Sequence, residues 1–228
     1  MSPLSLLDPI VHVLHQLLLV LVPVLPGTPG VQVALALTLL TFAVRAAMLP
    51  LSLRSWHSQQ VRLALAPELD GLRRRYRADR SRLVRELEAA HRRAGVGPLS
   101  GLGSAVLQLP LLAASYRLVT ATWIGTTANI VTTAPLWGAP LSAHWLPVIA
   151  GAGIVSAPTA AFCTVLAVLL VLAHRTAAQQ GGDGPALLRL LPYGTLVTAA
   201  VLPLAVSIYL MSSTLWTVTE RAFFARLT

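Results

Sequence analysis

The sequence predicts an all-α integral membrane protein, with five transmembrane helices in a bundle, a cytoplasmic helical hairpin and an N-terminal amphipathic helix at the membrane interface. Of the 228 residues, 55% are hydrophobic and 11% are charged, whereas soluble domains have about 25% charged residues. Charged residues are absent over long blocks, as in membrane spans. Eleven of the 17 basic residues lie between Arg54 and Arg93, and such a basic segment beside a span is typical of the cytoplasmic side.

The N-terminal stretch is apolar but interrupted by polar residues and prolines. Ile10, Val13 and Leu17 share one side of a helix, and His12 and His15 lie near each other on another side. This pattern predicts a helix that lies on the bilayer surface, or at most a marginal span. A Pro-Gly-rich turn at 26–30 then precedes the first span.

The polar segment between the first two spans has helical periodicity. Leu65, Leu69 and Leu72 recur at spacings of three and four residues, and Leu83 and Leu87 repeat the pattern. We therefore expect two antiparallel helices that bury these apolar stripes against each other, with a turn near 77–79.

Apolar blocks and their breaks set the expected boundaries, and the last long block is divided at Pro203 into two short spans. The expected segments are an interfacial helix over 1–30, spans over 31–53, 101–124, 154–174, 186–202 and 203–219, the cytoplasmic hairpin over 54–100, an extracytoplasmic loop over 125–153, a cytoplasmic loop over 175–185 and a cytoplasmic tail over 220–228. The arginines that flank the spans then all lie on the cytoplasmic side, with the N-terminus outside and the C-terminus inside.

Arg45 is the most informative residue of the first span. It lies nine residues before Arg54, about 13 Å along a helix, so it is too deep to reach the cytoplasmic surface easily. An arginine near the bilayer centre costs at least about 2.5 kcal/mol, and the spans contain no acidic residue before Glu220. Arg45 therefore predicts a water-filled cavity that admits a negatively charged visitor. The alternative is an arginine that Ser, Thr, Gln and backbone carbonyls hold to join the helices.

Other polar residues in the spans suggest what lines that cavity. Gln108 offers donors and an acceptor from the second span. The last span is unusually polar, and its side chains could line the opposite wall or join helices by hydrogen bonds. Its polar residues are Ser207, Tyr209, Ser212, Ser213 and Thr214. Arg117 is expected to extend its charged end outward rather than into the cavity.

The sequence contains no pattern for covalent catalysis. No histidine is placed to activate a serine within a span, no His, Cys and acid cluster has metal-site spacing, and no glycine-rich phosphate loop is present. Cys163 is the single cysteine, so we expect it to be a small buried apolar residue. We predict a protein that is not an enzyme and that uses no cofactor and no metal.

Six short motifs occur in order along nearly the whole chain. They are Arg45-Ala-Ala-Met-Leu-Pro50-Leu51, Ser58-Gln59, Ala66-Pro67-Glu68-Leu69 followed by Arg73–Tyr76 and Asp79, Gly95-Val96-Gly97-Pro98, Leu107-Gln108-Leu109-Pro110, and the Pro203, Tyr209 and Ser213 series. In this order the motifs resemble those of the YidC/Oxa/Alb superfamily of membrane protein insertases, in its short bacterial form.

The resemblance implies a protein of the bacterial inner membrane that inserts client transmembrane segments through a hydrophilic groove, without nucleotide hydrolysis. It implies clients that are newly made membrane proteins, contacts with anionic lipids, and the ribosome and Sec translocon as further partners, with no specific DNA binding. The groove residues would be Arg45, Gln108, Ser207, Tyr209 and Ser213, and the hairpin residues Pro67, Glu68 and Tyr76. Two alternatives stay open: a small transporter or channel for an anionic solute, and a structural membrane subunit.

Overall fold

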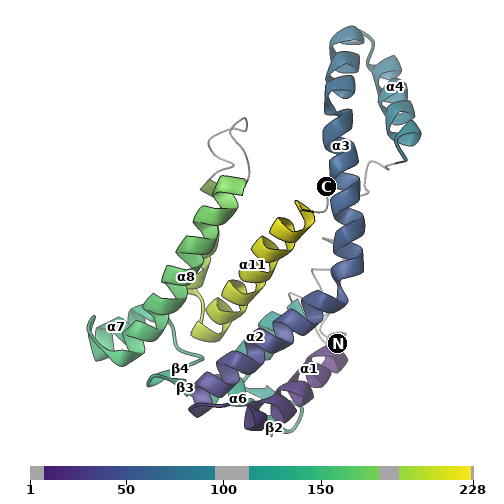
Figure 1. Cartoon of the computed structure of the whole chain (residues 1–228). Coiled ribbons are helices and arrows are strands. Elements are labelled where there is room, and N and C mark those ends of the chain that lie inside the picture. The colour runs from purple at the N-terminus through teal and green to yellow at the C-terminus, as the bar shows by residue number, and fades with distance from the viewer. Residues whose placement is uncertain (1–7, 96–112, 180–189, 227–228) are drawn as a thin grey trace. The chain divides into compact units, whose positions relative to one another are not determined.

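The computed structural model describes residues 8–95, 113–179 and 190–226 (Figure 1). Most of these residues are helical, as expected for an all-α membrane protein. The chain divides into two compact units, one formed by 1–46 with 111–228 and the other by 47–110.

The larger unit contains most of the apolar helices. Its elements are α1 (Asp8–Leu21), η2 (Val22–Val24), α2 (Pro29–Ala47), a helix over 113–120, β1 (Trp123–Ile124), β2 (Thr127–Ala128), α6 (Ile130–Thr133), β3 (Pro135–Leu136), β4 (Ala139–Pro140), α7 (Trp145–Ala152), α8 (Ala157–Gln179), η3 (Leu191–Tyr193), α10 (Gly194–Val201) and α11 (Leu204–Phe224).

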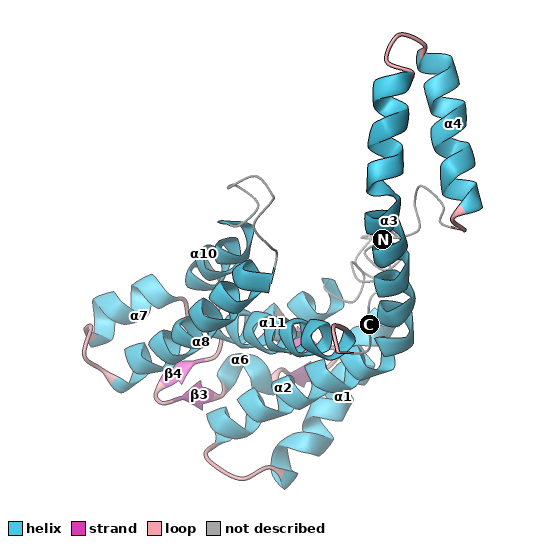
Figure 2. Ribbon diagram, turned by 45° about the horizontal axis from the view of Figure 1, so that its top comes forward, coloured by secondary structure: helices cyan, strands magenta, loops and turns pink. Residues whose placement is uncertain are grey.

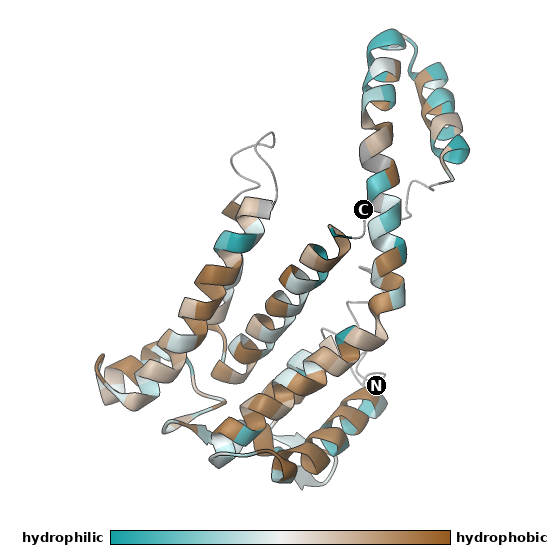
Figure 3. Ribbon diagram, in the orientation of Figure 1, coloured by the Kyte–Doolittle hydropathy of each residue, from teal (hydrophilic) through white to brown (hydrophobic). Residues whose placement is uncertain are grey.

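Two of the described helices are long and apolar enough to cross a bilayer by length and composition, Pro29–Ala47 and Ala157–Ala178. Figure 3 shows the hydrophobic residues in brown along α1, α2 and α8. Many large apolar side chains on these helices are exposed, such as Val171 at 59%. Exposed apolar surface of this kind is typical of a lipid-facing helix. The predicted count of five spans stays a prediction.

Helix α1 has apolar residues on two sides. Val11 and Leu14 are buried in the unit, while Ile10 and Val13 are exposed. The exposed side matches the apolar face expected from the sequence. His15, expected away from that face, is fully buried against the rest of the unit.

Helices α8, α10 and α11 pack against one another. Between the last two, α10 ends at Val201 and α11 begins at Leu204, so Pro203 lies in the break as the N-cap of α11. The first N–H groups of a helix have no partner within it. Here the N–H groups of Leu204 and Ala205 donate to the carbonyls of Ala143 and Leu141, at 3.0 and 2.8 Å. The segment before α7 therefore holds the start of α11.

Residues 123–153, expected as the end of a span and an extracytoplasmic loop over 125–153, contain short strands and helices. Strands β1 and β2 pair antiparallel, as do β3 and β4, and α6 and α7 are short helices (Figure 2). The backbone at Pro135 lies so close to Gly30 that a Cβ on Gly30 would be 2.0 Å from the Pro135 oxygen. Only glycine fits where two backbones approach this closely.

Cys163 was expected to be buried, and this expectation was wrong. The residue is exposed on α8, where its side chain would contact lipid if α8 spans the membrane.

The smaller unit is the helical hairpin expected from the sequence. Its helices α3 (Leu49–Arg75) and α4 (Arg80–Arg93) lie antiparallel and side by side (Figure 2), and Leu65 and Ala90 are buried. Helix α3 begins four residues before the expected boundary at 53, with Pro50 in its first turn, where a missing N–H costs no hydrogen bond.

Candidate functional site

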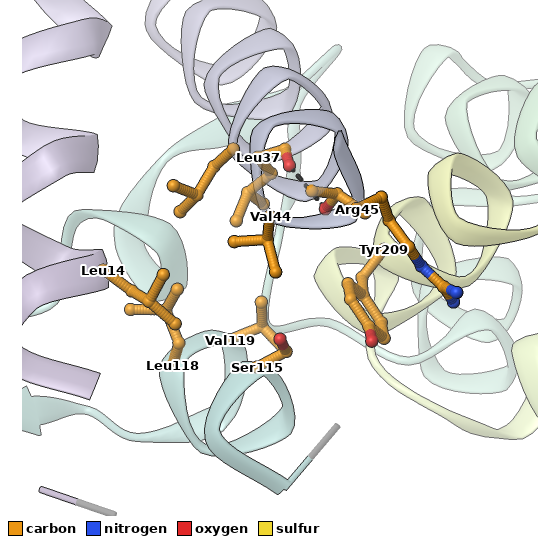
Figure 4. Close-up of a pocket in the computed structure, with 10 residues that line it drawn as sticks. Leu14, Leu37, Val44, Arg45, Ser115, Leu118, Val119 and Tyr209 are labelled. Atoms are coloured by element: carbon orange, nitrogen blue, oxygen red, sulfur yellow. Dashed lines mark hydrogen bonds between the residues drawn. The ribbon is translucent and has the colours of Figure 1, made fainter. Parts of the chain in front are cut away.

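Arg45 lies on the wall of a small cavity inside the larger unit. Helix α2 carries Arg45 in its last turn, and the Arg45 guanidinium donates a hydrogen bond to the Ser213 hydroxyl of α11. Figure 4 shows the Arg45 side chain extending toward α11, with Tyr209 beside it. The structure thus brings together three of the residues that the sequence predicted for one groove: Arg45, Tyr209 and Ser213.

The cavity is small and mostly apolar. Its volume is about 20 Å³, room for about one water molecule. Four helical segments contribute side chains, from α1, α2, the helix over 113–120 and α11. The lining residues are Leu14, Leu37, Leu40, Thr41, Val44, Arg45, Ser115, Leu118, Val119 and Tyr209. A polypeptide segment would need these helices to separate before it could enter.

Two further contacts connect α2 with α11, and both come from residues that precede Arg45 in α2. The Thr38 and Ser212 hydroxyl oxygens are 3.0 Å apart, and the rings of Phe42 and Trp216 have centroids 5.6 Å apart. From the first contact to the second, each helix advances by four residues. The two helices therefore run in the same direction with a fixed register, and the polar face of α11 is turned toward α2.

Ser207 does not belong to this face. Its hydroxyl is buried and donates to the carbonyls of Ala199 and Pro203, at 2.7 and 3.3 Å. At about 100° per residue, Ser207 lies about 160° around α11 from Tyr209. Ser207 thus joins α10 to α11, as the helix-joining alternative proposed. The sequence alone could have separated Ser207 from Tyr209, because the angle between two residues around a helix follows from their residue numbers.

The other residues predicted for these sites fall in three places. Gln108 lies outside the described residues. Arg117 is absent from the lining of the cavity and forms an ion pair of 2.6 Å with Asp8 of α1, a partner that the sequence did not suggest. The hydroxyls of Ser212 and Thr214 donate hydrogen bonds to the carbonyls of Ile208 and Leu210, one turn earlier in α11, at 2.9 and 2.7 Å.

The hairpin residues lie in the smaller unit. Pro67 is inside α3, and Glu68 forms an ion pair of 3.4 Å with Arg93 of α4. Tyr76 is the C-cap of α3, and the guanidinium carbon of Arg82 lies 5.1 Å from the Tyr76 ring centroid. These contacts connect the two helices of the hairpin.

Asp79 is the N-cap of α4 and is exposed to solvent. Its carboxylate accepts hydrogen bonds from the Arg82 N–H at 2.9 Å and the Ser81 hydroxyl at 2.8 Å. These hydrogen bonds, the backbone one first, lower the pKa of Asp79 below 3.8. Asp79 thus caps the start of α4 by accepting a hydrogen bond from a backbone N–H of the first turn.

Within the described part of the chain, no group of three or more His, Cys, Asp or Glu side chains is placed to hold a metal ion. The fold and the site define a helical membrane protein whose distinctive feature is an arginine at a cavity between apolar helices. Comparison with known proteins assigns the family. The family model described as 60Kd inner membrane protein matches residues 25–228. The chain belongs to this family, which confirms the resemblance to the YidC/Oxa superfamily.

Several relatives carry the name membrane protein insertase YidC. One from Alkalihalophilus pseudofirmus is 26% identical over 223 residues, which are 93% of this chain and 79% of the relative. One from Clostridium perfringens is 28% identical over 123 residues, which are 54% of this chain and 51% of that relative. One from Aliivibrio salmonicida is 37% identical over 82 residues, which are 36% of this chain and 15% of that longer protein.

Proposed function

We propose that this protein is a membrane protein insertase that moves client transmembrane segments from the cytoplasm into the bilayer. Family membership supports the activity, and the relatives' names do not favour solute transport. The observation that carries the site is the position of Arg45, at a cavity wall between α2 and α11.

In this proposal Arg45 attracts an acidic residue in the outgoing segment of a client. Ser213 holds the guanidinium on the α11 side, and Tyr209 lies beside it in the cavity wall. A carboxylate binds a guanidinium more strongly than a neutral hydroxyl does. The client carboxylate therefore displaces Ser213, and α2 and α11 separate to admit the chain. Burial of the client's apolar span in lipid drives the transfer, so no nucleotide is needed.

We also propose the orientation and the partners. The arginines of the hairpin favour a cytoplasmic position, which gives an N-terminus outside, a C-terminus inside and five spans in an inner membrane. The hairpin, which contains Pro67, Glu68 and Tyr76, carries basic residues such as Arg93, which pairs with Glu68, and Arg82, which lies over the Tyr76 ring. It is suited to receive clients, ribosomal RNA phosphates or anionic lipid headgroups. A Sec translocon is a further proposed partner.

Purified protein in liposomes tests the function. The client has one span and an acidic outgoing tail, and protection of that tail from added protease reports insertion. We expect the wild type to protect the tail and Arg45→Ala to reduce the protected fraction about tenfold, which corresponds to a lost interaction of about 1.4 kcal/mol. Arg45→Lys tests whether positive charge alone is sufficient.

Arg226→Ala is the matched control, because Arg226 is an exposed arginine outside the cavity. It should insert the client as well as the wild type does. Wild-type liposomes that protect no more tail than empty liposomes, with the protein shown to be folded, would refute the insertase proposal. Equal insertion by wild type and Arg45→Ala would refute only the role of Arg45.

A further inference from the structure

Helix α11 carries a second polar site on the side that faces α2, between the cavity-lining Tyr209 and the C-terminal end of the helix. Tyr209, Ser213, Trp216 and Glu220 lie within about 60° of one another around the helix. Tyr209 lines the cavity, Ser213 accepts from Arg45, and Trp216 contacts Phe42. The register between the two helices, continued by one turn, places Glu220 level with Ala46 of α2.

Two polar atoms on this side lack a partner among the described residues. The Trp216 indole nitrogen and Glu220 Oε1 are both buried and neither makes a hydrogen bond. These residues are four positions apart in α11, about one helical turn, so an unmet donor and an unmet acceptor belong to the same side of the helix. An unpaired buried polar group is costly, and native structures usually give such a group a partner or a function. Here they point to a ligand with a donor for the carboxylate.

We propose that Glu220 is a specificity-determining residue that holds the cationic residue following a client's transmembrane span. This inference rests on the proposed insertase function. In the proposed orientation Glu220 lies near the cytoplasmic end of α11, and the cytoplasmic flanks of membrane spans are rich in Lys and Arg. Glu220 is also the one acidic residue in α11, so its charge has no like neighbour in that helix.

The length of α11 fits this occupant. From Leu204 to Glu220 the helix rises over 16 residues, about 24 Å. A client helix lying along α11 with its cationic flank at Glu220 would reach the opposite end of α11 after about 16 residues, near the shortest length that spans a bilayer. Arg45 and Glu220 therefore act on different parts of the client: Arg45 on the acidic tail as it leaves, and Glu220 on the basic flank that stays.

The test uses the same liposome assay with three clients that differ only in the residue after the span, which is Lys, Gln or Glu. We expect Glu220→Gln to reduce insertion of the Lys client about fivefold, the scale of one partly screened charge pair, and to leave the Gln client unchanged. Glu220→Lys should reverse the preference and favour the Glu client.

A matched control moves the carboxylate off the face. Thr219 is exposed, and its hydroxyl donates to the Leu215 carbonyl of its own helix at 2.9 Å. The double variant Glu220→Gln with Thr219→Glu keeps the net charge and should behave like Glu220→Gln. If it behaves like the wild type, general surface charge explains the effect and the proposal fails.

The remaining outcomes are also decisive. Equal loss for all three clients would show a structural role for Glu220 and overturn the proposal. An effect that follows the phosphatidylethanolamine content of the vesicles, and not the client flank, would identify a lipid amine as the ligand and also overturn it. Wild-type protein that inserts all three clients equally contradicts this inference alone, whereas wild-type protein that inserts none contradicts the insertase function.

Discussion

Asn129 offers the sharpest test of how the segment after the helix over 113–120 is held together. Its side chain is buried, and its Nδ2 donates to the carbonyls of Leu118 and Ala121, at 2.6 and 2.7 Å, while its Oδ1 accepts from the Val131 N–H at 3.0 Å. One amide thus satisfies carbonyls at the end of one helix and an N–H at the start of α6. Both helix ends need such partners.

Asn129→Ala removes all three hydrogen bonds and leaves two of their backbone partners buried and the third, the Ala121 carbonyl, partly buried. At about 1–3 kcal/mol for each unsatisfied buried group, the loss is about 3 kcal/mol at the lower end. For a chain of this size that corresponds to a fall in melting temperature of about 6–12 °C. Thermal unfolding in detergent, followed by tryptophan fluorescence, measures it. Ser142→Ala is the control, because it removes an exposed hydroxyl that donates to the Thr132 carbonyl at 2.9 Å, and it should change the melting temperature little.

Asn129→Asp separates the roles of the two amide atoms. The carboxylate still accepts from Val131 but cannot donate, and it faces the two carbonyl oxygens. We expect it to be at least as destabilising as Asn129→Ala at neutral pH and to recover partly at low pH, where a protonated carboxyl can donate to one carbonyl. Wild-type stability of Asn129→Asp at neutral pH would refute the assigned hydrogen bonds.

Two other predictions follow from backbone packing and from the hairpin turn. Gly30→Ala should destabilise the larger unit by at least about 1–3 kcal/mol, because its Cβ would meet the Pro135 backbone, whereas Gly71→Ala, with nothing within 4 Å, should be neutral or stabilising by thermal unfolding. The pKa of Asp79 is lowered in the folded chain, so its cap contributes fully above the unfolded value of 3.8 and is lost as the pH falls through the lower folded pKa. Circular dichroism should therefore show a loss of helix below about pH 3.8 that Asp79→Asn lacks, since Asn caps without titrating. An unchanged pH profile in Asp79→Asn would contradict this role.

The sequence predicted well the features that depend on local pattern. Spacing of three and four residues located the hairpin. An arginine within an apolar block pointed to Arg45, which the structure places at a cavity wall, while its role stays a prediction. Those signals are strong because burial of apolar stripes and the cost of a membrane charge leave few alternatives.

Features that depend on tertiary contact were not predictable in the same way. The β-hairpins have two-residue strands, too short for a visible alternation, and the role of Asn129 depends on two carbonyls 8 and 11 residues away. Ser207 was grouped with Tyr209 by composition, although the two lie on opposite sides of α11. The unpartnered Glu220 oxygen became informative only when the register of α2 and α11 was known.

In the proposed mechanism, clients pass along the side of α11 that carries Ser213. Single cysteines at Ser213 and at Ser207, each with Cys163→Ser to remove the exposed native thiol, can be tested for cross-linking to a client with one cysteine beside its acidic tail residue. We expect a cross-link from Ser213→Cys that weakens when the acidic client residue is neutralised. We expect little from Ser207→Cys, which is buried and lies about 120° around α11 from Ser213. Equal cross-linking at both positions, or none at Ser213→Cys during active insertion, would contradict this mechanism.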